Sequence, residues 1–151
     1  MKSLGADVAI DYKTTRFEEV VRDQDVVFDT QAGETLLRSF DAVRSGGVVV
    51  TVGGRPDAKF ARAWGLSPPL VWILGFLNRK VDRLAKKKGV RFEYLFMHAS
   101  GEQLEQIGAL MDQGIIKPIL DKTFPLEAAA DAVSYVESGR AVGKVVIRVA
   151  D

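Results

Sequence analysis

The sequence predicts an α/β fold with a parallel sheet and helices on both faces. The first observation is a pair of short apolar runs, Asp25–Thr30 and Val48–Val52, whose branched and aromatic residues are typical of strands buried on both faces. The second is the helix-like segment between them, which indicates a right-handed parallel crossover. The third is the alternation of strand-like and helix-like segments along the whole chain, which favours α/β architecture.

The helix between these two strands is predicted from a set of apolar residues on one helical face. They are Leu36, Leu37, Phe40 and Val43. Gly46-Gly47 is expected to end this helix. The two strands end at the turns Thr30–Gly33 and Gly53-Gly54, and ligands of open α/β sheets bind outside the carboxyl ends of the strands. Because glycine lets a backbone approach a ligand closely, these two turns form the first candidate site.

Three shorter features precede this central unit. Met1–Asp7 has the pattern of a helix end, with Gly5 as its stop signal. Val8–Tyr12 is predicted to be a short strand. Thr15 and Glu18 have the spacing of a capping box and predict a short helix after that strand.

The segment after the central unit contains the longest predicted helix. Arg55–Gly65 is expected to be a loop, and Ser67-Pro68 then supplies a capping hydroxyl and a proline at the first helical position. The helix runs to Gly89, and the basic residues 86–88 in its last turn complement the helix dipole. Its first half, Leu70–Leu77, is apolar nearly all round. This surface is either covered on two sides within the fold or is an interface.

The rest of the chain continues the alternation of strands and helices. A second capping box, Ser100 with Gln103, opens a helix that ends at Gly114, and Pro125 opens another that ends at Gly139. The predicted strands are Val90–Met97, Ile119–Phe124 and Lys144–Val149.

Composition excludes several classes of function. The 151 residues have a net charge of +1, so no bulk field indicates a nucleic acid or an anionic membrane as partner. There is no cysteine, and His98 is the only histidine, so no metal site is expected. No apolar run reaches the roughly 20 residues that span a bilayer. These features, with no visible signal peptide, favour a cytoplasmic protein.

The ordered motifs resemble the cofactor-binding half of the medium-chain dehydrogenase/reductase superfamily, which is zinc-binding dehydrogenase by family name. Early motifs that carry the resemblance are Leu4-Gly5-Ala6-Asp7, Ile10-Asp11-Tyr12, Asp25–Thr30, and Gly46-Gly47 before a Val-rich strand. Later motifs resemble the zinc-independent quinone oxidoreductase-like branch. They are Tyr94-Leu95-Phe96-Met97, Phe124-Pro125-Leu126-Glu127, residues 135–141 and Gly143-Lys144-Val145-Val146. The resemblance covers essentially all of the chain and implies a Rossmann-like fold.

The resemblance is incomplete in one respect. Its members have a substrate domain, then a first strand and a glycine-rich phosphate loop, but this sequence contains no Gly-x-Gly-x-x-Gly. We therefore expect residues 1–151 to be a partial NAD(P)-binding domain that lacks the first βαβ unit, as a C-terminal fragment of a larger reductase. In the family strand order, two missing strands would separate Val8–Tyr12 from Asp25–Thr30.

For the intact protein, the resemblance implies an NADPH-dependent oxidoreductase of the quinone or enone reductase type, with no metal. The 151-residue chain, which lacks the phosphate loop, is expected to be inactive and to bind NADPH weakly or not at all. Thr30, Ala32 and Gly33 would then lie near the cofactor ribose, and Gly53 and Gly54 would let the cofactor pass toward the nicotinamide. The remaining cofactor-facing positions are Phe96 and Met97 near the nicotinamide ring, Tyr12 near the 2′-phosphate, and Gly143 with Lys144 in a loop facing the cofactor. Each of these residues also fits a plain turn, core or surface role.

Two other classes of function stay open at this point. A strand that ends in Asp, then a helix, a Gly-Gly pair and a further strand also occur in S-adenosylmethionine-dependent methyltransferases, although the alanine-rich helix before Lys144–Val149 favours the dehydrogenase. The other class is a non-catalytic, dimerising Rossmann-like module. Whichever of these classes applies, we expect a homo-oligomer, because unpaired strand edges are templates for a second chain.

Overall fold

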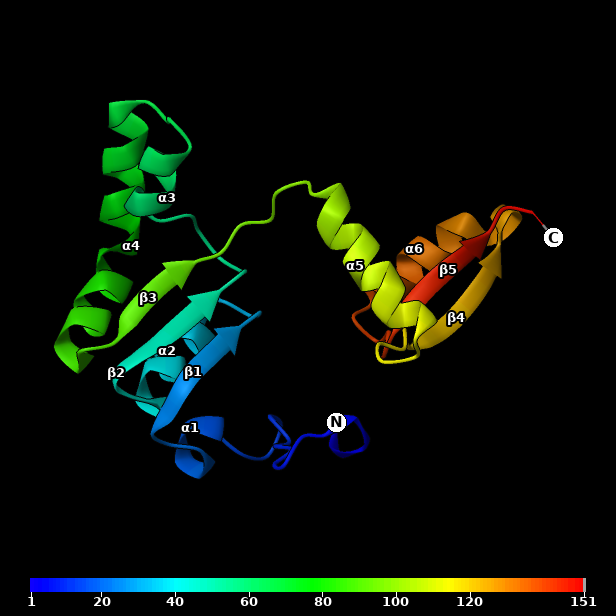
Figure 1. The fold of residues 1–151 in the computed structure, drawn as a ribbon, viewed down its shortest axis with the longest axis horizontal. Helices are drawn as coiled ribbons and strands as arrows, with labels where there is room; N and C mark the ends of the chain where they lie inside the picture. Colours follow the sequence, from blue (N-terminus) through cyan, green and yellow to red (C-terminus); the bar gives the residue numbers. More distant parts are fainter. Residues whose placement is uncertain (151) are drawn as a thin grey trace. The chain divides into compact units, whose positions relative to one another are not determined.

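The computed structural model describes residues 1–150, apart from the side chain of Ser3. It divides into two compact units, Met1–Met97 and His98–Asp151, each of which is described by itself. Parallel strands and flanking helices make up both units (Figure 1), and the predicted Rossmann-like α/β class is confirmed.

The first unit is built on a three-stranded parallel sheet. Its order is β1 (Gln24–Asp29), β2 (Val43–Thr51) and β3 (Arg91–Tyr94). The register places Val27 beside Val49 and Val49 beside Phe92, so these three side chains share one face. The three strands that the sequence predicts as parallel neighbours therefore pair as expected.

Both crossover helices pack on this face of the sheet. These helices are α2 (Gly33–Ala42) and α4 (Pro68–Lys88). The core between them and the sheet contains Leu36 and Phe40 from α2, Val81, Leu84 and Ala85 from α4, and Val43, Val49 and Val90. Right-handed crossovers that progress in one direction put their helices on the same side, so α2 and α4 share one face rather than lying on both. Val26 and Phe28 point to the opposite face, where they are exposed.

The segment before β1 differs from the sequence prediction. The described chain begins with a short 3-10 helix, η1 (Lys2–Leu4), which Gly5 ends in the left-handed conformation, as its stop signal indicates. The predicted strand Val8–Tyr12 does not form. A strand is stable only with a neighbour for its backbone groups, and no neighbouring strand pairs with this segment among the described residues.

The predicted capping box is also wrong. α1 (Phe17–Val20) begins after Arg16, and no side chain caps it. The N–H groups of Thr14 and Thr15 donate to the Asp11 carbonyl, and the Lys13 N–H donates to the Asp11 side chain. The turn organised by Asp11 takes the place of a Thr15 cap.

Gly46-Gly47 does not end α2, because the helix stops at Ala42 and β2 begins at Val43. The pair lies in an irregular part of β2, where the pairing with β1 jumps from Gln24–Val43 to Val26–Val48. Gly46 has φ +80°, and its N–H donates to the Gly89 carbonyl at 2.8 Å. A Cβ on Gly47 would lie 2.8 Å from the Asp25 carbonyl oxygen. The glycines thus allow a bulge in the strand, not a helix stop.

The long helix forms where it is predicted, between Ser67 and the left-handed Gly89. The preceding segment is not a plain loop, because α3 (Ala58–Ala63) forms within it. The Asp57 side chain accepts a hydrogen bond from the Phe60 N–H at 2.6 Å and caps α3.

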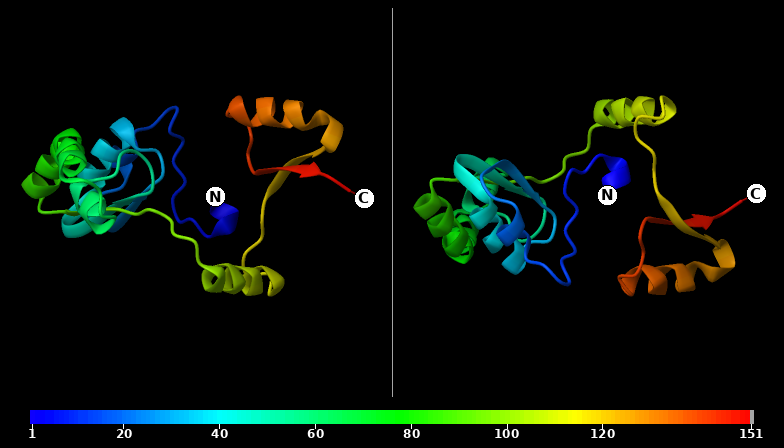
Figure 2. Two further views of the ribbon diagram at one scale, coloured as in Figure 1. Left: turned by 90° about the horizontal axis from the view of Figure 1, so that it is seen from above. Right: turned by 90° about the horizontal axis from the view of Figure 1, so that it is seen from below.

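The second unit contains two parallel strands and two principal helices. Its elements are α5 (Gly101–Asp112), β4 (Leu120–Pro125), the 3-10 helix η2 (Leu126–Ala128), α6 (Ala129–Glu137) and β5 (Lys144–Arg148). β4 pairs with β5, so the predicted last strand has a neighbour within the chain. Figure 2 shows α6 along one side of this strand pair and α5 on the other. Ser100 caps α5 by accepting from the Gln103 N–H, as predicted.

Candidate functional site

The carboxyl edge of the first sheet is organised by a buried pair, Asp29 and Thr51, which are 4% and 1% exposed. The Thr51 hydroxyl lies 2.7 Å from Asp29 Oδ2 and donates to it, while it accepts from the Gly53 N–H at 3.1 Å. The N–H groups of Ala32 and Gln31 also donate to the Asp29 carboxylate, at 3.0 and 3.3 Å. One carboxylate thus connects the turn after β1 to the turn after β2.

This pair was not among the site residues predicted from the sequence. The available signal is Asp29 at a strand end, two residues before a turn, since Asp side chains accept hydrogen bonds from the backbone that follows them. The pairing with Thr51 requires the register of two strands, which the sequence does not provide.

The two predicted turns lie against each other. A Cβ on Gly53 would lie 3.2 Å from the Ala32 Cβ and 3.3 Å from the Thr30 carbonyl oxygen, and one on Gly54 would lie 3.1 Å from the Ala32 Cβ. Ala32 and Gly33 both have positive φ, +60° and +58°. Thr30, Ala32, Gly33, Gly53 and Gly54 therefore form a single edge, made largely of backbone, which a ligand could approach closely.

Aromatic side chains flank this edge at the end of β3. The Leu95 N–H donates to the Thr51 carbonyl at 2.8 Å, which places Phe96 beside the same edge. The Phe96 ring lies 5.4 Å from that of Phe60 and 5.2 Å from that of Trp64, both of which come from the α3 segment. Met97, by contrast, is 82% exposed. The structure brings Phe96 to the candidate site, and sequence reasoning missed Phe60 and Trp64 because it predicted no helix there.

Tyr12 lies in a turn and is 85% exposed. It lines a cavity of about 440 Å³ together with residues of α1, of α2 and of the turn after β1; the others are Thr15, Phe17, Gln31, Thr35 and Arg38. Arg38 Nε is buried and has no hydrogen-bond partner among the described residues. Tyr12 thus shares a cavity with an arginine that lies 3.7 Å from the Glu18 carboxylate, next to the turn that contains Thr30.

Gly143 and Lys144 belong to the second unit, where the contacts of Gly143 are structural. A Cβ on Gly143 would lie 2.4 Å from the Ile119 carbonyl oxygen, which accepts from the Lys144 N–H at 2.7 Å. Only glycine fits here, because strand pairing brings the two backbones together. The structure does not place these two residues with the edge of the first sheet.

A polar cluster fixes the start of β5. The Asp121 carboxylate accepts from the Val142 N–H at 3.0 Å and from the Tyr135 hydroxyl at 2.9 Å. These two donors, the backbone N–H first, lower the pKa of Asp121. The same hydrogen bond raises the pKa of Tyr135. The cluster joins α6 and the loop before β5 to β4.

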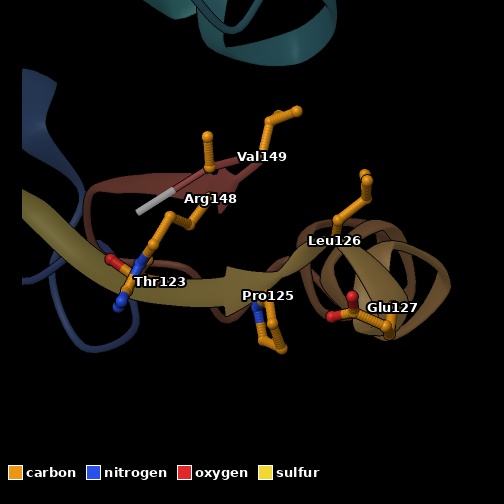
Figure 3. A pocket seen from close by; sticks show the side chains of 7 residues that line it. Thr123, Pro125, Leu126, Glu127, Arg148 and Val149 are labelled. Atoms are coloured by element: carbon orange, nitrogen blue, oxygen red, sulfur yellow. The ribbon is translucent and has the colours of Figure 1, made fainter.

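A cavity of about 450 Å³ lies at the carboxyl ends of β4 and β5. Figure 3 shows Thr123, Pro125 and Arg148 on one side of the strands, and Leu126 and Val149 on the other. No residue predicted for the site lines it.

Two features are absent from residues 1–150. No group of three or more His, Cys, Asp or Glu side chains in this part of the chain is placed to hold a metal ion. No helix that the structure describes combines the length and apolar character needed to cross a bilayer.

The zinc-binding dehydrogenase family model matches residues 4–147, which is nearly the whole chain. The chain belongs to this family. The predicted resemblance to medium-chain dehydrogenases/reductases is thereby confirmed. The alternative of a methyltransferase is removed.

Relatives of this zinc-binding dehydrogenase chain are named as oxidoreductases or reductases. It is 33% identical to the 2-methylene-furan-3-one reductase of Solanum lycopersicum, over 97% of the chain and 30% of that protein. It is 33% identical to the human mitochondrial NAD(P)H oxidoreductase RTN4IP1, over 99% of the chain and 38% of that protein. The chain thus spans about 30 to 40% of the curated relatives that it matches.

Solved structures support the fold. The quinone oxidoreductase of Coxiella burnetii superposes with a TM-score of 0.75, at 24% identity, over 99% of this chain and 41% of that one. At this identity the match shows the Rossmann-like fold alone.

Proposed function

We propose that this chain is the cofactor-binding part of an NAD(P)H-dependent oxidoreductase that reduces quinones or enones. The names of two relatives, an NAD(P)H oxidoreductase and a furanone reductase, support this class. The observation that carries the proposal is the edge formed by the Thr30–Gly33 turn and Gly53-Gly54, at the carboxyl ends of parallel strands.

The edge suits a nicotinamide dinucleotide because side chains leave it open. Thr30, Ala32 and Gly33 line the ribose position, and Gly53 with Gly54 allows the chain of the cofactor to pass toward the nicotinamide. Asp29 and Thr51 hold both turns in place beneath it. The cofactor supplies the hydride when bound, so these residues need only bind and orient it.

The ends of the cofactor are assigned to two further groups. Phe96 and Met97 pack near the nicotinamide ring, with the Phe60 and Trp64 rings behind Phe96. Tyr12 binds near the 2′-phosphate of NADPH, and the guanidinium of Arg38 in the same cavity is a suitable partner for phosphate. Gly143 and Lys144 stay predictions from the family resemblance.

Zinc has no role in this proposal. The family description names zinc, but the described residues contain no ligand cluster that fits it. The proposed hydride transfer assigns no metal ligand to residues 1–150. A cytoplasmic location remains a prediction, and a curated relative is named as mitochondrial.

The proposal is tested by measuring NADPH binding to this chain at millimolar ligand by the change in cofactor fluorescence. In Gly53→Val the new Cβ lies only 3.2 Å from the Ala32 Cβ, and the valine side chain fills the edge. This variant should abolish any NADPH binding that the chain shows. Gly101→Val is the matched control, because nothing lies within 4 Å of its Cβ position. Equal binding by the chain and Gly53→Val would exclude this edge as the cofactor site.

A further inference from the structure

The first half of α4 and the segment before it expose an unusual number of large apolar side chains. We call this group the aromatic tip; it consists of Trp64, Leu66, Leu70, Trp72, Ile73, Phe76 and Leu77, all of which are exposed. Trp72 is 81% exposed and Phe76 59%. Figure 1 shows α3 and the first half of α4 standing clear of the sheet, while the second half of α4 runs beside β3.

The exposed stripe of α4 is not needed to pack the helix. Leu74, Asn78, Val81 and Ala85 recur at helical spacing and face inward, and the Asn78 side chain donates to the Pro56 carbonyl at 2.7 Å. Trp72 and Phe76 lie on the opposite side. The apolar side chains of this outer stripe are therefore not covered by any of the described residues. Exposed apolar surface of this kind indicates a binding partner.

The same outer stripe becomes cationic in the second half of α4. After Phe76 it continues through Arg79, Lys80, Arg83 and Lys87, all exposed. The Arg79 guanidinium lies 4.1 Å from the centre of the Phe76 ring, at the junction of the two halves. No ion pair within the described residues involves Lys80, Arg83 or Lys87. One helical face thus carries aromatic side chains and then free positive charges.

The surrounding segment is strongly basic, although the whole chain is not. Residues 55–91 contain ten Lys or Arg and two Asp or Glu, whereas the complete sequence contains 21 and 20. The net charge of +1 therefore averages a basic segment with an acidic remainder. The expectation that no membrane is a partner rested on that average and does not apply to α4.

α5 provides a contrast within the same chain. It too exposes apolar side chains, Leu104, Ile107 and Met111, but its charged residues are Glu102, Glu105 and Asp112. An anionic surface would repel α5 and attract α4. Among the helices that the structure describes, only α4 combines exposed aromatic residues with adjacent cations.

We propose that the outer stripe of α4 docks on the surface of an anionic lipid bilayer. Exposed Trp, Phe and Leu next to a Lys/Arg-rich stretch is the pattern of helices that lie in the interface between headgroups and acyl chains. The aromatic tip enters the interfacial region, and Arg79, Lys80, Arg83 and Lys87 contact lipid phosphates. Docking of this kind places the helix on the membrane without crossing it. A second copy pairing stripe against stripe is a poorer partner, because its stripe offers these cations no opposite charge.

Docking would also orient the candidate site. Trp64 of the aromatic tip contacts the Phe96 ring at the end of β3, so the tip is joined by side-chain packing to the strand that ends beside the Gly53 edge. The membrane contact itself does not depend on the proposed reductase function, because binding to lipid vesicles can be measured without cofactor or substrate.

Intrinsic fluorescence tests the proposal without a label, because both tryptophans of the chain, Trp64 and Trp72, belong to the aromatic tip. Adding vesicles of phosphatidylcholine with phosphatidylserine should shift the emission to the blue and expose it to quenching by brominated lipid. High salt should weaken the effect by screening. Vesicles of phosphatidylcholine alone should bind far more weakly.

Substitutions separate the two halves of the stripe. The triple variant Lys80→Gln, Arg83→Gln, Lys87→Gln should bind on the order of a hundredfold more weakly, at about fivefold for each cation near the surface. Lys13→Gln, Arg22→Gln, Lys117→Gln removes the same charge from exposed positions elsewhere and should bind as the parent does. Ile73→Ser, Phe76→Ser should weaken binding by about tenfold or more, with Val142→Ser, Val149→Ser as its exposed control.

Three results would overturn the proposal. The first is unchanged emission with anionic vesicles. The second is equal loss of binding in the α4 variants and their controls. The third is a blue shift that needs no vesicles and grows with protein concentration, which would show that a second copy covers the tip.

Discussion

Replacing Thr51 with valine tests how the candidate edge is held together. The side chain is 1% exposed, and its hydroxyl donates to Asp29 at 2.7 Å and accepts from the Gly53 N–H at 3.1 Å. Valine has nearly the same shape, so no cavity forms and the change isolates the polar contacts. Loss of a hydrogen bond to a charged acceptor costs about 1.5–3 kcal/mol, and an unpaired Gly53 N–H adds about 1 kcal/mol because that residue is only partly buried. We expect Thr51→Val to destabilise the first unit by about 2–4 kcal/mol.

Urea unfolding followed by tryptophan emission measures this change, because Trp64 and Trp72 both lie in the first unit. Thr15→Val is the control: its side chain is exposed, and the change should stay within about 0.5 kcal/mol. A double-mutant cycle with Asp29→Asn should show coupling of about 1 kcal/mol or more. A Thr51→Val effect no larger than that of the control would refute the role of this pair.

Further predictions concern the second unit and catalysis. Gly143→Ala should lower the thermal midpoint of the second unit, because the new Cβ would lie 2.4 Å from a backbone oxygen; Gly108→Ala, with open space at its Cβ, should not. The lowered pKa of Asp121 means that its stabilisation is full above the unfolded pKa of about 3.9 and is lost as pH falls through the folded pKa. Acid unfolding followed by circular dichroism should therefore lose part of its pH dependence in Asp121→Asn. The 151-residue chain should not oxidise NADPH with quinones, and steady loss of cofactor absorbance above a no-protein blank would contradict this.

The sequence was sufficient for features that depend on local pattern. The apolar runs of β1 and β2 predicted two parallel neighbours, and Gly89 marked the end of α4 correctly. The adjacency of Thr30 and Gly53 also followed from the sequence, since the carboxyl ends of parallel strands meet at one edge.

Features that depend on distant partners could not be predicted. Val8–Tyr12 has the composition of a strand, but a strand needs a neighbour, and the structure pairs none with it among the described residues. Gly46-Gly47 has the pattern of a helix stop, yet the backbone of Asp25 and Gly89 decides that it forms a bulge. The Asp29–Thr51 pair likewise depends on strand register.

The surface of α4 shows a different limit. From the sequence, the apolar first half of α4 could be covered either by the rest of the fold or by an interface. The structure shows that its large apolar side chains are exposed. Self-association through strand edges remains a prediction. Net charge averaged over the chain concealed the basic segment because acidic residues elsewhere balance it.

An amide chemical-shift map of the ¹⁵N-labelled chain, titrated with NADPH, tests the central claim most directly. Weak binding suffices, because fast exchange still moves the affected resonances. The proposed function predicts the largest shifts at the amides of Gln31, Ala32, Gly33, Gly53 and Gly54, with smaller shifts at Gly101 and Gly108. Shifts concentrated away from this edge would contradict the claim that it is the cofactor site.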